Sequence, residues 1–373
     1  MTGDLILDGT KIAWYRDRVE AWERGERIAP VTVDMALYPR ERCNFNCGYC
    51  YASKAGQHNE GRGIDRAVIR AFLEDAAEIG VKGISFVSDG ESSHHPDFAH
   101  AIAYGKSLGL AMAVGSNALV VDRAMSEAIV PHLTYFRVNI SGGEPKRYAE
   151  IMGVKEHFFE RVCQNIRDMV AVKRAGGHAC TIGMQMVLMP NLADQILPLA
   201  RLAIELEPDY LIIKHCSDDE FGHIGVDYEA YEALYPVLRE AEAMSTAKTR
   251  IAIKWSKIGD KGKRSYNRCY GPPFIIQLSG TGLVAPCGML FNERYKDKFH
   301  IGNIATTRFK DIWRSDRYWE IMNLLASPAF DAQTMCGTLC LQHKVNGALD
   351  DHKKGVAPLP AHPGAPPAHI EFL

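Results

Sequence analysis

The stretch Arg42-Cys43-Asn44-Phe45-Asn46-Cys47-Gly48-Tyr49-Cys50-Tyr51 places three cysteines on one short segment, with the spacing C-x3-C-x2-C. A [4Fe–4S] cluster takes four ligands. Three thiolates on one loop therefore hold such a cluster but leave one iron open to a substrate or cofactor. The alternatives are a zinc site completed by a residue such as His58, or three unrelated buried thiols.

The composition is that of a soluble globular protein. The chain has 373 residues, of which 47% are hydrophobic, and a net charge of −2, so we expect one large domain and a smaller one without the basic excess of a nucleic-acid binder. The segment MTGDLILDGT lacks the apolar core of a signal peptide, and no apolar run approaches the ~18 residues of a membrane span. We therefore expect a cytoplasmic protein that binds neither nucleic acid nor membrane.

The cysteines are grouped. Disulfides rarely persist in the cytoplasm, so the ten cysteines need another explanation. Such grouping favours metal ligation. The two groups are Cys43, Cys47 and Cys50, and Cys269, Cys287, Cys336 and Cys340.

Strand-like and helix-like segments alternate along the first two thirds of the chain. Six β-then-α units imply parallel strands with right-handed crossovers, and hence an α/β fold, a partial (β/α)6 TIM-like barrel with its chemistry at the C-terminal strand ends. A helix at residues 10–26 leads into it. The expected strands are 31–37, 83–88, 111–116, 133–140, 181–189 and 209–215, and the expected helices are 65–79, 97–108, 122–130, 157–175, 192–205 and 227–247.

Strand parity predicts which side chains face the barrel interior. Phe136, Val138 and Ile140 share one face of the fourth strand, and polar residues share the other. Because the outer face packs on helices, we expect the polar sets to point into a common lumen. These sets are Arg137, Asn139 and Ser141 on the fourth strand, Gln185 on the fifth, and Lys214 and Cys216 on the sixth.

The pattern changes after about residue 250. Residues 274–286 predict a β-hairpin with the glycine-rich turn Ser279-Gly280-Thr281-Gly282, and residues 310–325 a helix. The proline-rich segment from 350 is expected to be disordered or loosely packed. We expect a lead-in at 1–30, a core at 31–250, a hairpin and helix iron–sulfur domain at 251–349, and a tail at 350–373.

The cysteine loop after the first strand of a β/α series, with Tyr49 before Cys50, resembles the radical SAM superfamily. The resemblance covers about residues 30–250. It implies that Cys43, Cys47 and Cys50 hold a [4Fe–4S] cluster and that S-adenosylmethionine chelates the open iron. It also implies reductive cleavage of this cofactor to a 5′-deoxyadenosyl radical, which abstracts a hydrogen atom from an unactivated C–H bond.

The resemblance implies further residues that bind the cofactor. Asp89-Gly90-Glu91, after the second strand, is similar to the family's Gly-Gly-Glu, with Asp89 in place of the first glycine. Glu91 would accept from the methionine amine. Gly142-Gly143 would let the backbone approach the cofactor. The expected cofactor-binding residues are Tyr49, Gly90, Glu91, Ser116, Asn117, Asn139, Ser141 and Gln185.

The second cysteine group resembles the SPASM and twitch extensions of radical SAM enzymes. Cys269 and Cys287 flank the expected hairpin, and Cys336-x3-Cys340 follows. A full SPASM module has seven cysteines and two auxiliary clusters. The four here imply the shorter twitch form, with one fully ligated auxiliary [4Fe–4S] cluster. A closed tetrahedral zinc site is the alternative.

Cys216 and Lys214 are the candidate catalytic residues at the end of the sixth strand, near His215, Asp218, Asp219 and Glu220. By resemblance to radical SAM epimerases, the Cys216 thiol could return a hydrogen atom to a substrate radical. The other outcome is dehydrogenation, with an electron passing to the auxiliary cluster and a proton to a base. Cys216 could instead be a buried structural thiol.

The lumenal residues and the resemblance favour a small polar substrate, such as a carbohydrate, aminocyclitol or nucleoside. The expected partner is a one-electron reductant such as flavodoxin or ferredoxin. A peptide substrate is the first alternative, although the roughly 30 residues before the first strand are too few for a peptide-recognition domain. The second alternative is a non-catalytic iron–sulfur or zinc protein.

Overall fold

The computed structural model describes residues 10–54, 63–338, 340–361 and 363–373, so His58 lies outside the described residues. Within this part of the chain, one ten-stranded sheet has the order β10-β9-β8-β1-β2-β3-β4-β5-β6-β7. The strands are β1 Thr32–Met35, β2 Gly83–Phe86, β3 Ala111–Ser116, β4 Tyr135–Asn139, β5 Thr181–Leu188, β6 Tyr210–His215, β7 Arg250–Ile253, β8 Ile275–Leu278, β9 Leu283–Ala285 and β10 Gly302–Asn303.

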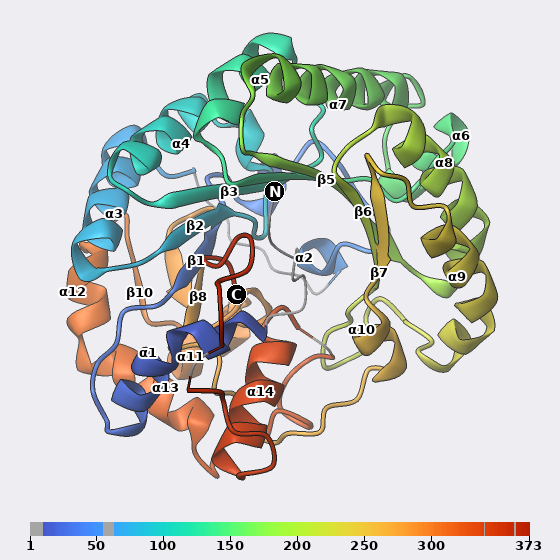
Figure 1. The fold of residues 1–373 in the computed structure, drawn as a ribbon. Coiled ribbons are helices and arrows are strands. Elements are labelled where there is room, and N and C mark those ends of the chain that lie inside the picture. Colours follow the sequence, from blue (N-terminus) through green and yellow to red (C-terminus); the bar gives the residue numbers. More distant parts are fainter. Residues whose placement is uncertain (1–9, 55–62, 339, 362) are drawn as a thin grey trace.

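Strands β1 to β7 run parallel in sequence order, and the sheet curls into a barrel that is not closed (Figure 1). Most helices lie around the outside of the sheet, whereas the short helix Tyr51–Lys54 lies within the ring of strands in this view. This confirms the partial barrel. The helices are α1 Arg16–Glu23, α2 Tyr51–Lys54, α3 Arg66–Ile79, α4 Phe98–Ser107, α5 Arg123–Ile129, α6 Pro145–Met152, α7 His157–Gly176, α8 Ile196–Leu206, α9 Tyr235–Ala243, α10 Trp255–Gly259, α11 Lys296–Phe299, α12 Phe309–Arg314, α13 Asp316–Ala326 and α14 His343–Lys353.

Local capping explains where some of these helices begin. The carboxylates of Asp65 and Asp122 accept hydrogen bonds from the backbone N–H groups of Val68 and Met125, each at 2.9 Å, and so begin α3 and α5. Asp97 makes no such cap at α4 but pairs with Arg66. The sequence did not predict α6 or β7. The helix expected at 227–247 is a 3-10 turn, Glu229–Leu234, followed by α9.

Strand parity is confirmed on β4. Phe136 and Val138 are fully buried under the helices, whereas Tyr135, Arg137 and Asn139 keep partial exposure on the opposite face. That face is the lumenal side of the barrel. The lumen therefore has a polar wall that retains accessible surface.

The C-terminal hairpin continues the barrel sheet. Strand β8 pairs parallel with β1, with Thr32 opposite Ile275, and β9 and β10 follow in antiparallel pairs. At the hairpin turn, the backbone N–H of Gly280 donates to the carboxylate of Asp89 at 3.0 Å. The segment that carries the second cysteine group is thereby fixed against β1 and the end of β2.

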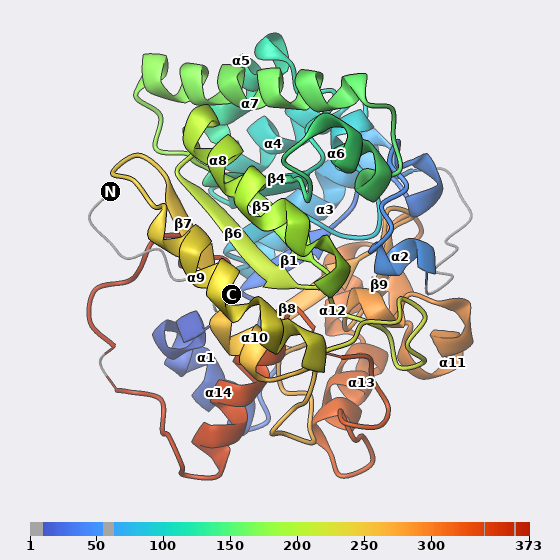
Figure 2. The same ribbon diagram turned by 90° about the vertical axis from the view of Figure 1, so that its right-hand side faces the viewer.

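The C-terminal tail is packed, which corrects the expectation of disorder for its described residues. The Lys11 ammonium donates to the carbonyls of His369 and Phe372, and the Thr32 hydroxyl donates to the carbonyl of Glu371. The Phe372 ring meets lumenal Tyr135 edge-on, with ring centroids 5.1 Å apart. The tail thus closes the end of the barrel away from α2 (Figure 2). Nothing in its proline content predicts these contacts.

Among the described residues, no helix is long and apolar enough to cross a membrane.

The packing of Phe372 gives a first prediction. Phe372 is 6% exposed, so Phe372→Ala should lower the free energy of unfolding by about 3 kcal/mol, measured by urea denaturation. Val356→Ala removes an apolar tail side chain that is 73% exposed and should change it by less than about 0.5 kcal/mol. Equal stabilities of the two variants would contradict the packed tail.

Candidate active site

The cysteine loop follows β1 and is anchored on α6. The backbone N–H groups of Asn46 and Gly48 donate to the carbonyls of Met152 and Ile151, at 3.2 and 3.0 Å. Phe45 is buried and packs its ring against Tyr148. A helix that the sequence did not predict therefore holds the loop at the C-terminal strand ends.

The three loop thiols lie close enough to influence one another. Burial raises the pKa of Cys43 to about 12, with further contributions from Glu91 and Cys50. Burial also raises the pKa of Cys47, together with Cys50 and Cys43. Three mutually repelling thiolates suit an iron–sulfur cluster, because its cationic irons favour the deprotonated sulfurs. Among the described residues, no three histidine, cysteine or acidic side chains stand close enough to hold a single metal ion.

Tyr49 and Ser141 fix the loop from the barrel side. The Ser141 hydroxyl donates to the Tyr49 phenol at 3.0 Å, and the phenol donates to the Met152 sulfur at 3.2 Å. Ser141 also accepts from the backbone N–H of Val187. Tyr49 and Ser141 both lie beside the cysteine loop, as the sequence predicts. Their hydroxyl groups bind other residues and hold the loop in place.

Glu91 is a buried carboxylate that joins the ends of β2 and β3. Its Oε1 atom accepts from the Ser93 N–H, the Ser93 hydroxyl and the Ser116 hydroxyl, and its Oε2 accepts from the Asn117 N–H at 2.8 Å. A carboxylate offers about four lone-pair sites, two on each oxygen. Oε2 therefore keeps room for a further donor beside Cys43, which fits a cofactor ammonium.

Gly90 and Asp89 serve packing in this structure. A Cβ at Gly90 would lie 1.8 Å from the carbonyl oxygen of Tyr38, so only glycine fits between the second-strand motif and the segment after β1. Asp89, the departure from Gly-Gly-Glu, is the acceptor for the hairpin turn. Gly142 and Gly143 also pack tightly, against the backbones of Tyr148 and Leu199, and their expected approach to the cofactor stays a prediction.

The turn after β3 contains residues that the sequence did not single out. Ala118 has a left-handed backbone with φ 60°, an uncommon state for a residue with a side chain. The buried Asn165 amide on α7 donates to the carbonyls of Ala118 and Leu119, and the Asn117 side chain donates to Asn44 in the cysteine loop at 2.7 Å. The sequence did not predict this role of Asn165, because a single asparagine within a helix forms no recognisable motif.

Asn139 and Gln185 form a pair on the lumenal wall. The Gln185 amide donates to the Asn139 carbonyl oxygen at 2.8 Å. This bond leaves the amide nitrogen of Asn139 and the amide oxygen of Gln185 for a ligand. Of the expected cofactor-binding residues, these two keep the polar groups that ribose hydroxyls require.

The four cysteines of the second group lie near one another beside the hairpin. Burial raises the pKa of Cys336 to about 11, with Arg264 lowering it and Cys340 raising it. An Arg264 N–H donates to the Cys336 sulfur at 3.7 Å, and the Asn346 amide donates to the Cys269 sulfur at 3.6 Å. Burial raises the pKa of the Cys287 thiol, and the other three thiols raise it further. Donors aimed at sulfur suit a thiolate-ligated cluster.

Two residues connect the cysteine groups. Gln277 on β8 donates to Asp34 on β1 and accepts from the backbone N–H of Gly288, the residue after Cys287. Burial raises the pKa of Tyr51, to which the nearby charges of Asp89, Cys50 and Cys287 add. Tyr51 therefore stands between the two groups.

The end of β6 holds Cys216 next to the cysteine loop. Its Sγ donates to the Tyr49 carbonyl oxygen at 3.8 Å, and burial raises its pKa to about 12. Lys214 lies on the same side of the strand, partly exposed. His215 points away into the core, with its Nδ1 on the Cys216 carbonyl oxygen.

The acidic residues after β6 make hydrogen bonds and an ion pair within the protein. Asp218 accepts from the backbone N–H groups of Ile224, Gly225 and Val226. Asp219 accepts from the N–H groups of Phe221 and His223, and Glu220 pairs with Arg294 at 2.8 Å. These carboxylates shape the loop that follows the strand.

The cysteine sets predict the iron content. Two [4Fe–4S] clusters need about eight irons per chain, so reconstituted protein should bind about eight, and Cys287→Ala about four, by colorimetric iron analysis. Cys163→Ala is the matched control, because Cys163 is buried on the apolar face of α7 and should leave about eight. About four irons in the unchanged protein, or bound zinc at the second group, would refute an auxiliary iron–sulfur cluster.

Comparison with known families matches residues 37–203 to the radical SAM superfamily and residues 269–340 to SPASM, an iron–sulfur cluster-binding domain. A cofactor-modifying protein for the tungsten-containing aldehyde ferredoxin oxidoreductase of Pyrococcus furiosus is 22% identical over 293 residues, 74% of this chain and 79% of that protein.

Solved structures share the fold. SuiB of Streptococcus suis bound to its precursor peptide SuiA has a TM-score of 0.61 at 16% identity, over 83% of this chain and 70% of that one. The enzyme anSMEcpe with bound AdoMet has a TM-score of 0.56 at 14% identity, over 79% and 84%. The chain is a member of the radical SAM superfamily with a C-terminal SPASM iron–sulfur domain, and its cofactors are S-adenosylmethionine and iron–sulfur clusters.

Proposed function

We propose that this enzyme abstracts a hydrogen atom from a small polar substrate in the barrel lumen and that Cys216 returns a hydrogen atom to the substrate radical, so that the reaction is an epimerisation. The observation that carries this proposal is the position of the Cys216 thiol, 3.8 Å from the carbonyl oxygen of Tyr49 in the cysteine loop.

The cofactor residues divide between the loop and the strand ends. Cys43, Cys47 and Cys50 would hold the [4Fe–4S] cluster, and Oε2 of Glu91 would accept from the methionine amine. Asn139 and Gln185 would meet the ribose. When bound, this cluster supplies the electron that splits S-adenosylmethionine into methionine and the 5′-deoxyadenosyl radical.

Cys216 has the protonation state that hydrogen-atom transfer requires. Burial keeps its pKa near 12, so the sulfur carries its hydrogen at neutral pH. The S–H bond breaks as a C–H bond forms on the substrate, and the sulfur is left as a thiyl radical. One electron from the reductant partner and one proton from solvent restore the thiol.

Dehydrogenation is the alternative outcome, and Asp34 is a candidate base for it. Its carboxylate is buried on β1, and burial raises its pKa to about 6, within reach of a proton-accepting role near neutral pH. The electron would pass to the auxiliary cluster held by Cys269, Cys287, Cys336 and Cys340. Gln277 ties Asp34 to the residue after Cys287.

The substrate class rests on the lumenal wall. Its partly exposed side chains are polar, which favours a carbohydrate-, aminocyclitol- or nucleoside-like molecule. The names of SuiB and its precursor peptide favour a peptide as the second candidate. We also propose the division into a core at 31–250 and an auxiliary-cluster domain at 251–349, with flavodoxin or ferredoxin as reductant.

The cofactor assignment is tested by product analysis. Under anaerobic, reducing conditions the protein should form 5′-deoxyadenosine from S-adenosylmethionine, measured by chromatography. Cys47→Ala should abolish this product because the cluster loses a ligand, whereas Cys163→Ala should retain it. Persistent 5′-deoxyadenosine from Cys47→Ala would remove the loop from the mechanism.

The role of Cys216 is tested with substrates deuterated at ring carbons. The true substrate transfers deuterium into 5′-deoxyadenosine. With that substrate, Cys216→Ala should still form 5′-deoxyadenosine but lose at least about 100-fold in epimer, because no S–H bond remains to quench the radical. Cys180→Ala, also a buried cysteine, should retain full epimer formation. Unchanged epimer from Cys216→Ala would eliminate this thiol, and an oxidised product would favour dehydrogenation.

A further inference from the structure

Arg137 on β4 is a lumenal cation that makes no side-chain hydrogen bond or ion pair with the described residues. Its neighbours on both adjacent strands are glycines, Gly115 on β3 and Gly183 on β5. Its Nε is buried and makes no hydrogen bond, and no ion pair within the described residues involves its guanidinium. A Cβ at Gly115 would lie 2.6 Å from the Val87 side chain, and a Cβ at Gly183 would lie 2.1 Å from the Tyr210 ring, so the two glycines make room for Val87 and Tyr210 beside Arg137.

Lys214 on β6 adds a second basic group to the same wall. Among the described residues, its ammonium has no hydrogen bond or ion pair. Burial lowers its pKa well below the usual value, and the neighbouring charges of Lys257, Arg137 and Lys254 lower it further. Lys214 and Arg137 are therefore close enough to repel each other.

Among the described residues, no carboxylate forms an ion pair with Arg137 or Lys214. Arg137 lowers the pKa of Asp34, yet the two lie too far apart for an ion pair within 4 Å, and Asp34 accepts from Gln277 instead. Lys257 donates to the Cys340 carbonyl. Cys216, another titratable neighbour of Lys214, is held as a neutral thiol by burial.

Unpaired cations inside a protein cost free energy unless an anion compensates them. The planar guanidinium donates two parallel hydrogen bonds to a carboxylate or phosphate, and an ammonium adds a point charge. The unpaired Nε of Arg137 suits this geometry. A bound anion would also relieve the repulsion between Arg137 and Lys214.

We propose that Arg137 and Lys214 form an anion-binding site in the barrel lumen that holds a carboxylate or phosphate of the substrate. This inference rests on the proposed function and narrows it to an anionic small molecule. Because Lys214 lies two residues before Cys216, the site would hold the substrate beside the thiol.

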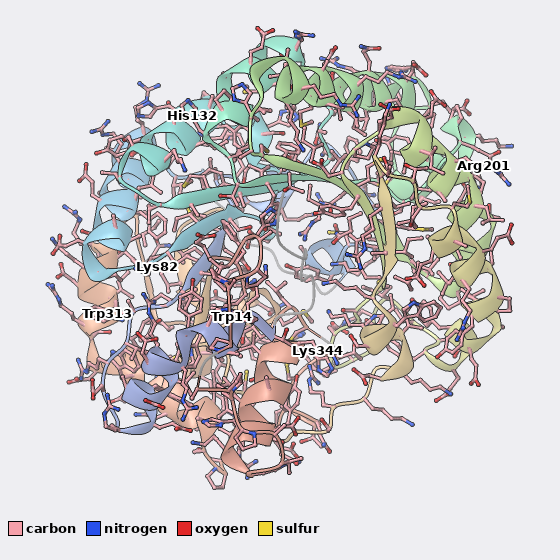
Figure 3. The ribbon with its side chains drawn as sticks, in the orientation of Figure 1. Trp14, Lys82, His132, Arg201, Trp313 and Lys344 are labelled. Atoms are coloured by element: carbon pink, nitrogen blue, oxygen red, sulfur yellow. The ribbon has the colours of Figure 1, made fainter. Side chains whose placement is uncertain are left out.

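Inorganic phosphate is the probe. Reconstituted protein without substrate should broaden the ³¹P signal of phosphate saturably. Arg137→Gln and Lys214→Gln should each weaken binding at least about 10-fold, because one charged hydrogen-bond donor is lost. Arg201→Gln on the outer face of α8 and Lys82→Gln, both exposed, are the matched controls and should bind as the unchanged protein does (Figure 3). Iron content and circular dichroism check folding, and Arg137→Lys, which keeps the charge, should recover part of the affinity.

Competition identifies which anion the site takes. Acetate that displaces phosphate would indicate a carboxylate, and methyl phosphate that displaces it better than acetate would indicate a phosphate ester. S-adenosylmethionine should not displace it, and Arg137→Gln should leave the dissociation constant of S-adenosylmethionine unchanged.

Three results would overturn the proposal: no saturable broadening, equal binding by Arg137→Gln and the unchanged protein, or displacement by S-adenosylmethionine. The last would mean that the two cations serve the cofactor carboxylate. Failure to form 5′-deoxyadenosine would instead contradict the proposed function while leaving the phosphate measurement intact.

Discussion

The buried carboxylate of Glu91 is the constraint on which the site depends. Four donors from the ends of β2 and β3 converge on it, and one of them is the backbone N–H of Asn117, whose side chain reaches the cysteine loop. Without these donors, a buried carboxylate would cost several kcal/mol. The hydrogen bonds that Glu91 accepts therefore set the spacing between the ends of β2 and β3 and the cysteine loop. Ala118, the next residue in this turn, has an uncommon left-handed backbone, and its N–H donates to the Ser116 hydroxyl, which itself donates to Glu91.

The second constraint is the continuity of the sheet through β8. Because β8 pairs with β1, the hairpin that carries Cys287 is fixed to the strand that leads into the cysteine loop. Asp89 binds the hairpin turn from the side of β2, and Gln277 links Asp34 to the backbone beside Cys287. The departure from a glycine at Asp89 therefore has a structural reason. It couples the motif after β2 to the auxiliary segment.

The sequence predicted the features that depend on local pattern. Alternating β and α segments gave the parallel barrel, and parity placed Arg137 and Asn139 on the lumenal face. The features it missed depend on distant contacts. Nothing near residue 372 indicates that Phe372 packs on Tyr135, and the spacing around Asp218 cannot show that its carboxylate is consumed by the following loop. Polar residues near a strand end were predicted as ligands because a sequence does not show which acceptors are already satisfied.

The two ends of the lumen differ from its wall in how many of their polar groups already have hydrogen-bond partners. At the cysteine loop, the hydroxyl of Ser141 and the side chain of Glu91 are largely occupied by hydrogen bonds to other residues. Along the wall, the Asn139 and Gln185 amides are half satisfied, and Arg137 has no partner among the described residues. At the opposite end, Phe372 and the tail backbone close the barrel. A radical formed at the cysteine loop would therefore face the polar side chains of the lumen, with the C-terminal tail closing the opposite end of the barrel. Cys216 lies at the loop end of this polar wall. In the proposed reaction, substrate orientation by Lys214 and radical quenching by Cys216 would therefore depend on the same short segment at the end of β6.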